Sequence, residues 1–199
     1  LTVDEHLIRA VGNVAAIERG ELKSEHPLST DIIKRVKSRE ALYCAILLHD
    51  IAKGLPGDHS DVGAALADTL CPRWGLSPED TAAVAWLVKN HLVMSDTAQK
   101  RDISDSKTVR DFVSVVQTPE MLRLLLVLTV ADIRAGGPGV WNGWKGQVLR
   151  ELYYEAEALM TGGDAALARA ARIEQAKAGR AALIADLSDA SLERALSRH

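Results

Sequence analysis

Apolar residues recur at helical spacing along most of the chain, and this feature does most to limit the fold. The segment from Val3 to about Glu18 carries apolar residues at Val3, Leu7, Ala10 and Val14, the three- and four-residue spacing of one helix face. No sustained alternation of β-branched residues, the mark of a half-buried strand, interrupts the pattern. The sequence therefore predicts an all-α fold.

Residues that begin and end helices divide this pattern into separate segments. The clearest start is Ser77, a capping residue followed by Pro78 and two acids, and Asp58 and Thr118 are similar N-caps. Gly54 and Gly136 mark two ends. After the first helix we expect helices over residues 39–53, 58–70, 77–94, 107–116, 118–135 and 141–160.

The segment boundaries predict one helical domain over residues 1–162. Residues 163–199 are rich in Ala and Arg, and we expect them to form a helical extension or a linker toward a further regulatory domain. The sequence begins with Leu1 rather than Met, which favours a domain cut from a longer protein.

Composition excludes several classes of function. A net charge of −3 argues against a nucleic-acid-binding protein, which usually carries a basic face. No apolar run reaches the roughly 18 residues of a membrane span. Cys44 and Cys71 stand apart, without zinc-ligand spacing, so we expect reduced core thiols in a cytoplasmic protein.

Two carboxylates stand at the ends of apolar helices. Asp50 and Asp132 each follow a run of apolar residues, where the helix macrodipole is negative and disfavours an acid by about 0.3–1 kcal/mol. A divalent cation between the two would remove this cost. The alternative is an ion pair for each, with Lys53 or Arg134 for instance.

The histidines favour the cation. His91 lies on the same predicted helix face as the apolar residues Leu87 and Val88. His6 accompanies apolar residues of the first helix, His49 directly precedes Asp50, and His59 stands at a helix start. We therefore expect all four histidines to point inward. His26 and His199 are expected on the surface. Imidazole and carboxylate ligands without thiolate suit Mn²⁺, Mg²⁺, Fe²⁺ or Zn²⁺ in a catalytic rather than a structural site.

The order of these residues, H…HD…H…H…D, resembles that of the HD-domain metal-dependent phosphohydrolases. The resemblance implies two metal ions that share Asp50, and a water between them as the nucleophile on phosphorus. It assigns one ion to His6, His49, Asp50 and Asp132. It assigns the other to His59, His91 and Asp50. The resemblance favours Mn²⁺ or Mg²⁺, with Fe²⁺ and Zn²⁺ as alternatives.

A closer resemblance covers roughly residues 1–160. The segments "LTVDEH", "LLHDIAKGLPGDHSDVGA", "WLVKNHLVMSDTAQKRDISD" and "LTVADIRAGGPGVWNGWKGQVLRELY" are similar to the HD segment of the bifunctional PII uridylyltransferase/uridylyl-removing enzymes. This resemblance implies hydrolysis of the uridylyl-tyrosine bond of the PII protein, with UMP as product. It also implies nucleotidyltransferase and ACT domains in the full-length protein. An HD nucleotide hydrolase of other specificity and a non-catalytic metal- or ligand-binding regulatory domain are the alternatives.

Three cations near these residues are further candidates. Besides Asp50, we expect Lys53 to act in catalysis as a phosphate contact or proton donor, unless it only offsets the helix dipole. Arg134 could bind phosphate with its planar fork, unless it pairs with Asp50 or a surface acid. Lys145 could also face phosphate. For its neighbours Trp141 and Trp144 we expect burial at a helix start.

Overall fold

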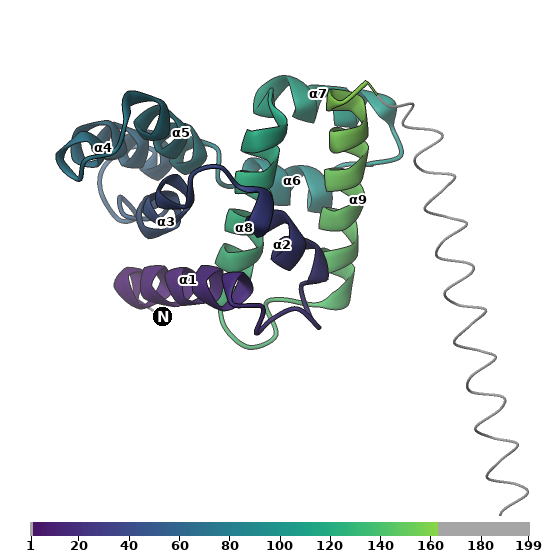
Figure 1. The fold of residues 1–199 in the computed structure, drawn as a ribbon, viewed down its shortest axis with the longest axis horizontal. Helices are drawn as coiled ribbons and strands as arrows, with labels where there is room; N and C mark the ends of the chain where they lie inside the picture. Colours follow the sequence, from purple (N-terminus) through teal and green to yellow (C-terminus); the bar gives the residue numbers. More distant parts are fainter. Residues whose placement is uncertain (1, 163–199) are drawn as a thin grey trace, which may run out of the picture.

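The computed structural model describes residues 2–162, and this part of the chain is helical without strands, which confirms the all-α prediction (Figure 1). Its helices are α1 (Val3–Glu18), α2 (Pro27–Ile32), the 3₁₀ helix η1 (Ile33–Arg35), α3 (Arg39–Leu48), α4 (His59–Arg73), α5 (Pro78–Lys89), α6 (Val93–Lys100), α7 (Ser106–Val116), α8 (Pro119–Ala135) and α9 (Gly143–Met160). The helical extension expected over residues 163–199, and His199 with it, lies outside the described residues.

Side-chain caps begin several helices as the sequence predicts. Asp58, Ser77 and Thr118 each accept a hydrogen bond from a backbone amide in the first turn of the helix that follows. Such a cap satisfies an amide that has no partner within the helix, which contributes about 1 kcal/mol. The cap on Asp58 also determines where α4 starts, so that His59 is the first residue of that helix.

Helix α8 is the centre of the packing. All residues from Leu124 to Ala131 are buried, and α8 contacts α1, α3 and α9. In Figure 1, α1 and α3 lie to one side of α8 and α9 to the other. Because α8 is buried on all sides, its C-terminal end brings Asp132 into the region where α1 and α3 also meet it.

Some helix boundaries differ from those predicted. Helix α3 ends at Leu48 rather than at Lys53, because Ile51 N–H donates to the Leu48 carbonyl at 3.1 Å and Lys53 N–H to the Asp50 carbonyl at 3.0 Å. These three-residue turns replace the α-helical ladder. Helices α2 and α6 were not expected, and α5 stops before His91 rather than continuing to residue 94.

No single helix among residues 2–162 is long and apolar enough to cross a membrane. Within these residues, the pair α7 and α8 taken together would be long and apolar enough, but the two helices are bent by 99° relative to each other. Cys44 and Cys71 are free thiols, as expected, and burial raises the pKa of Cys71 to about 11.

Helix α4 packs tightly against α5 at Gly63. A Cβ added there would lie 2.9 Å from Cγ1 of the buried Val88, and a β-branched core side chain has little freedom to move away. We therefore expect Gly63→Ala to lower the free energy of unfolding by about 1–3 kcal/mol. Urea unfolding would measure the change.

Gly12→Ala is the matched control, since Gly12 is also helical but an added Cβ there meets no atom within 4 Å. This variant should gain up to about 1 kcal/mol from helix propensity alone. Equal stabilities for the two variants would contradict the close packing at Gly63.

Two expectations about aromatic and imidazole burial are wrong. His26 is only 3% exposed, because its ring packs edge-on against Trp141, with ring centroids 4.5 Å apart, and its Nε2 lies 3.2 Å from Nη1 of Arg134. Trp144 is 55% exposed. Helix α9 starts after the Asn142 cap, which turns Trp144 outward, whereas Trp141 is partly buried as expected.

The burial of His26 makes stability depend on pH. Burial, and next the Arg134 cation, lower the pKa of His26 from its usual value of 6.5. The folded chain therefore holds fewer protons at His26 than the unfolded chain, so stability is full above the unfolded pKa and falls as pH drops toward the folded one. We expect the loss of stability from about pH 7 to about pH 5 to be smaller in His26→Gln than in wild type. Urea unfolding across this range would test it, and identical slopes would contradict it.

Candidate metal centre

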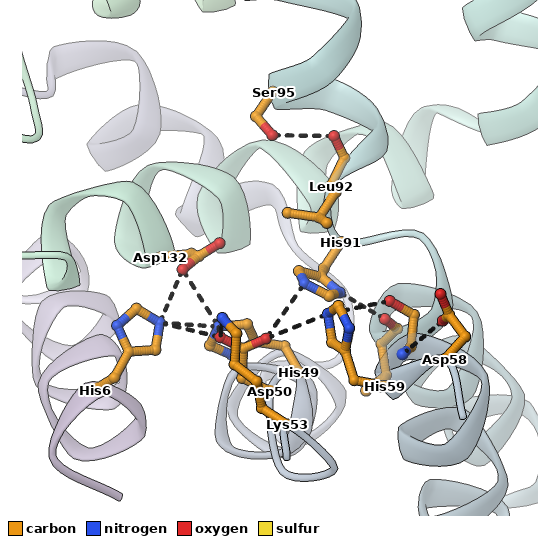
Figure 2. Close-up of polar contacts among 12 residues, drawn as sticks. His6, His49, Asp50, Lys53, Asp58, His59, His91, Leu92, Ser95 and Asp132 are labelled. Carbon is orange, nitrogen blue, oxygen red and sulfur yellow. Dashed lines mark hydrogen bonds and ion pairs between the residues drawn. The ribbon is translucent and has the colours of Figure 1, made fainter. Parts of the chain in front are cut away.

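Five separate segments bring the six predicted ligands together, as Figure 2 shows. They come from α1, the end of α3, the start of α4, the turn between α5 and α6, and the end of α8: His6, His49, Asp50, His59, His91 and Asp132. Asp50 lies in the middle, with His6 and Asp132 to one side and His59 and His91 to the other. The inward direction predicted for the four histidines is thus observed.

The first group consists of His6, His49 and Asp132. The Nε2 atoms of His6 and His49 lie 3.2 Å apart, and they lie 2.9 and 3.3 Å from Oδ1 of Asp132. Ligand atoms at about 2.0–2.2 Å from one metal ion are themselves roughly 3 Å apart. The spacing of these three atoms therefore matches a shared cation.

The second group consists of His59, His91 and Asp50. Nε2 of each histidine lies 3.6 Å from Oδ1 of Asp50. The other carboxylate oxygen, Oδ2, lies 3.7 Å from both His6 and His49. Each oxygen of Asp50 therefore faces a different group of ligands, which is the arrangement of a bridging carboxylate.

Backbone carbonyls orient the two most buried histidines. Nδ1 of His49 lies 2.7 Å from the Ile46 carbonyl, and Nδ1 of His91 lies 2.7 Å from the Val88 carbonyl. A carbonyl only accepts, so each Nδ1 carries the proton and donates it. Each Nε2 then presents a lone pair to the cluster, as metal-binding histidines do.

The charges in the cluster support one another. Burial alone would raise the pKa of Asp132, but the neighbouring rings of His49 and His6, which donate to its carboxylate when they are protonated, hold this pKa well below its usual range. Burial would lower the pKa of His49, and the Asp132 carboxylate raises it on balance. For His91, burial lowers the pKa, which favours the neutral ring that a metal requires.

One buried oxygen indicates what the cluster lacks in this arrangement. Asp50 is 3% exposed, and its Oδ1 has no hydrogen-bond partner among the described residues. An unpaired carboxylate oxygen in the interior is costly, and two facing imidazole lone pairs do not offset it. Divalent cations at the two groups would satisfy this oxygen and all four histidines, so the residues present fit metal ions.

The predicted cations take different places. Lys53 Nζ donates to Oδ2 of Asp50 at 2.7 Å, at the edge of the cluster (Figure 2). Burial would raise the pKa of Asp50, but this hydrogen bond, with the charge of His49, lowers it on balance. Arg134 instead pairs with Glu25, the surface-acid alternative, and Lys145 donates to the Val140 carbonyl at 2.7 Å. Neither cation is brought into the cluster.

Other polar residues near the cluster were missed in the sequence. Arg9 and Asn13 lie with Glu25 and Arg134 around a cavity whose lining does not include the six candidate ligands themselves. Arg9 and Asn13 follow His6 by three and seven residues, the spacing of one helix face, and this regularity is a signal that could have found them.

An all-α chain with this ordered set of histidines and aspartates has the form of an HD domain, and the HD-domain profile matches residues 3–136. The chain belongs to the HD-domain family. It is 58% identical over 196 residues to a bifunctional uridylyltransferase/uridylyl-removing enzyme of Azospirillum brasilense, which covers 98% of this chain and 21% of that protein. A protein of the same description from Rhodopseudomonas palustris is 52% identical over 200 residues, with 100% of this chain and 21% of that protein covered. The chain thus spans about one fifth of the length of these curated relatives.

Proposed function

We propose that this chain is a metal-dependent phosphodiesterase that hydrolyses the uridylyl-tyrosine bond of PII and releases UMP. The observation that carries the proposal is the Asp50 carboxylate, whose two oxygens face two separate groups of ligands. Two ions held in this way suit attack on phosphorus. Of the two activities in the relatives' name, uridylyl removal is the hydrolytic one.

We propose that each group of ligands holds one divalent ion, Mn²⁺ or Mg²⁺, with Fe²⁺ and Zn²⁺ as alternatives. His6, His49 and Asp132 would hold one ion, His59 and His91 would hold the other, and Asp50 would be a ligand of both. When bound, such ions lower the pKa of water and neutralise phosphate oxygens. The buried imidazoles hold that charge in place because backbone carbonyls orient them.

The reaction breaks the bond between phosphorus and the tyrosine oxygen, and a water oxygen forms the new bond to phosphorus. Water supplies two protons, of which one neutralises the departing phenolate. Phenolate is a fair leaving group, since its conjugate acid has a pKa near 10. Lys53 is the ammonium beside the bridging carboxylate, and we propose that it contacts phosphate or delivers that proton.

The test is UMP release from uridylylated PII by this chain, with Mn²⁺ or Mg²⁺ and with a chelator. Release that requires metal supports the proposal. Hydrolysis of free nucleotides without release from uridylylated PII would indicate another HD hydrolase. Metal binding without any turnover would indicate a regulatory domain.

Lys53→Gln should slow UMP release by about 10- to 100-fold, the loss typical of a residue that hydrogen-bonds to a metal ligand. The matched control is Lys89→Gln, since Lys89 also forms an ion pair with an aspartate, Asp61, at 3.0 Å, but on the surface. Steady-state rates with uridylylated PII would measure both. Equal rates for Lys53→Gln and wild type would exclude a catalytic role for Lys53.

A further inference from the structure

A cavity of about 530 Å³, a volume in the range of small-molecule sites, has walls that come close along the chain to two of the candidate ligands. Arg9 follows His6 by three residues, and Arg134 follows Asp132 by two. It is lined by α1, the segment before α2, the end of α8 and the α8–α9 loop. In Figure 1 this loop lies at the foot of α8, near the C-terminal half of α1. Its polar wall consists of Arg9, Asn13, Glu25 and Arg134.

Helix α1 relates the cavity wall to the first group of candidate ligands. Arg9 and Asn13 lie about 5 and 10 Å beyond His6 along the axis of α1, given the rise of an α-helix. Asn13 Nδ2 donates to the Ala131 carbonyl at 3.0 Å, and Ala131 directly precedes Asp132. A nucleotide with its phosphate at the metal centre would therefore have its nucleoside within reach of this cavity.

The donors that face the cavity suit a neutral ring with carbonyl groups. Arg9 is exposed and forms no ion pair or hydrogen bond among the described residues, so all its N–H groups are available. Arg134 is held by Glu25, which offsets its charge, and by His26. Asn13 uses its amide N–H on Ala131, which leaves its carbonyl oxygen free to accept.

The opposite end of the metal centre has the reverse charge. A second cavity of about 390 Å³ adjoins the segments of His59 and His91. Its lining includes the carboxylates of Asp58, Asp61 and Asp96 against the single cation Lys89, which pairs with Asp61, so its net charge is negative. Carboxylates there disfavour a nucleotide, whose carbonyl oxygens and phosphate need donors. The charges of the two cavities would thus favour the nucleoside side of the phosphodiester at the first cavity and disfavour it at the second.

The geometry points to the cavity at Arg9 and Asn13 as the site of the uridine of the substrate. This inference rests on the proposed function, which places the phosphate at the metal centre. Arg9 donates to a uracil carbonyl oxygen, and the Asn13 carbonyl accepts the uracil N3–H. Cytosine, which has an amino group in place of one carbonyl and no N3–H, fits these partners less well.

Calorimetric titration of the chain with UMP, CMP and inorganic phosphate, in the presence of Mg²⁺, tests the inference. We expect wild type to prefer UMP to CMP. Arg9→Ala should weaken UMP binding about 10-fold, since a hydrogen bond from a charged donor is lost. It should reduce the preference for UMP over CMP and leave phosphate binding unchanged.

Arg73→Ala is the matched control, an exposed arginine on α4 that does not line the cavity, and it should bind UMP as wild type does. Equal losses of UMP and phosphate affinity in Arg9→Ala would place Arg9 on the phosphate and overturn the inference. Unchanged UMP binding in Arg9→Ala, or no UMP binding by wild type, would also overturn it. UMP release from uridylylated PII by wild type is measured separately, so the failure of this cavity differs from the failure of the proposed function.

Discussion

We expect Asp50→Asn to slow UMP release from uridylylated PII by more than about 100-fold. Loss of a residue that only supports a metal ligand costs about 10- to 100-fold, and Asp50 is itself the ligand that faces both groups. An amide keeps the shape of the carboxylate but loses its charge and one acceptor oxygen. Rates in saturating Mn²⁺ would measure the effect.

The fold should survive this substitution. Asn fills the same volume, and the apolar core is built from other residues, so the helical circular dichroism of the variant should match wild type. Asp68→Asn is the control, because Asp68 is an exposed carboxylate on α4 and should retain full activity. If Asp50→Asn releases UMP at a rate close to wild type, the shared carboxylate is not required and the proposed site is wrong.

The candidate ligands could be found in the sequence because of their places on the helices. His49, Asp50, His59 and Asp132 stand where helices begin or end, and His6 and His91 accompany apolar residues at helical spacing. Asp132 follows a run of buried residues, and His59 follows the Asp58 cap. Signals for helix starts and ends identify both positions one by one. The order of the six residues along the chain then indicates that they belong to one site. The distances, and the division of the ligands into two groups around Asp50, depend on how the helices pack.

Apart from Trp144, whose exposure follows from the local Asn142 cap, the main errors come from contacts between distant segments. His26 precedes a proline in an otherwise polar stretch, and its burial depends on Arg134, 108 residues further along the chain. The turns after Leu48 likewise override a helix-forming segment, since they place Asp50 among histidines from three other segments. The cavity at Arg9 arises only when α1, α8 and the α8–α9 loop meet.

We also expect metal to raise the thermal midpoint of the chain by about 5–10 °C. A ligand at 100 times its Kd, bound only by the folded state, stabilises it by about 2.7 kcal/mol. In a domain of this size each kcal/mol corresponds to roughly 2–4 °C. Melting curves with Mn²⁺ and with a chelator would measure the metal-dependent increment, which is the difference between the two thermal midpoints. This measurement requires no substrate.

His6→Ala and His91→Ala divide the increment between the two groups of ligands. If two ions bind, each variant should lose part of the increment, because each removes one imidazole from a different group. The increment, rather than the midpoint itself, is compared, since removing a buried ring also destabilises the apo chain. His26→Gln is the matched control, as His26 is buried but not a ligand, and it should keep the whole increment. A full increment in His91→Ala would mean that the second group does not hold an ion, and Asp50 would then serve a single metal.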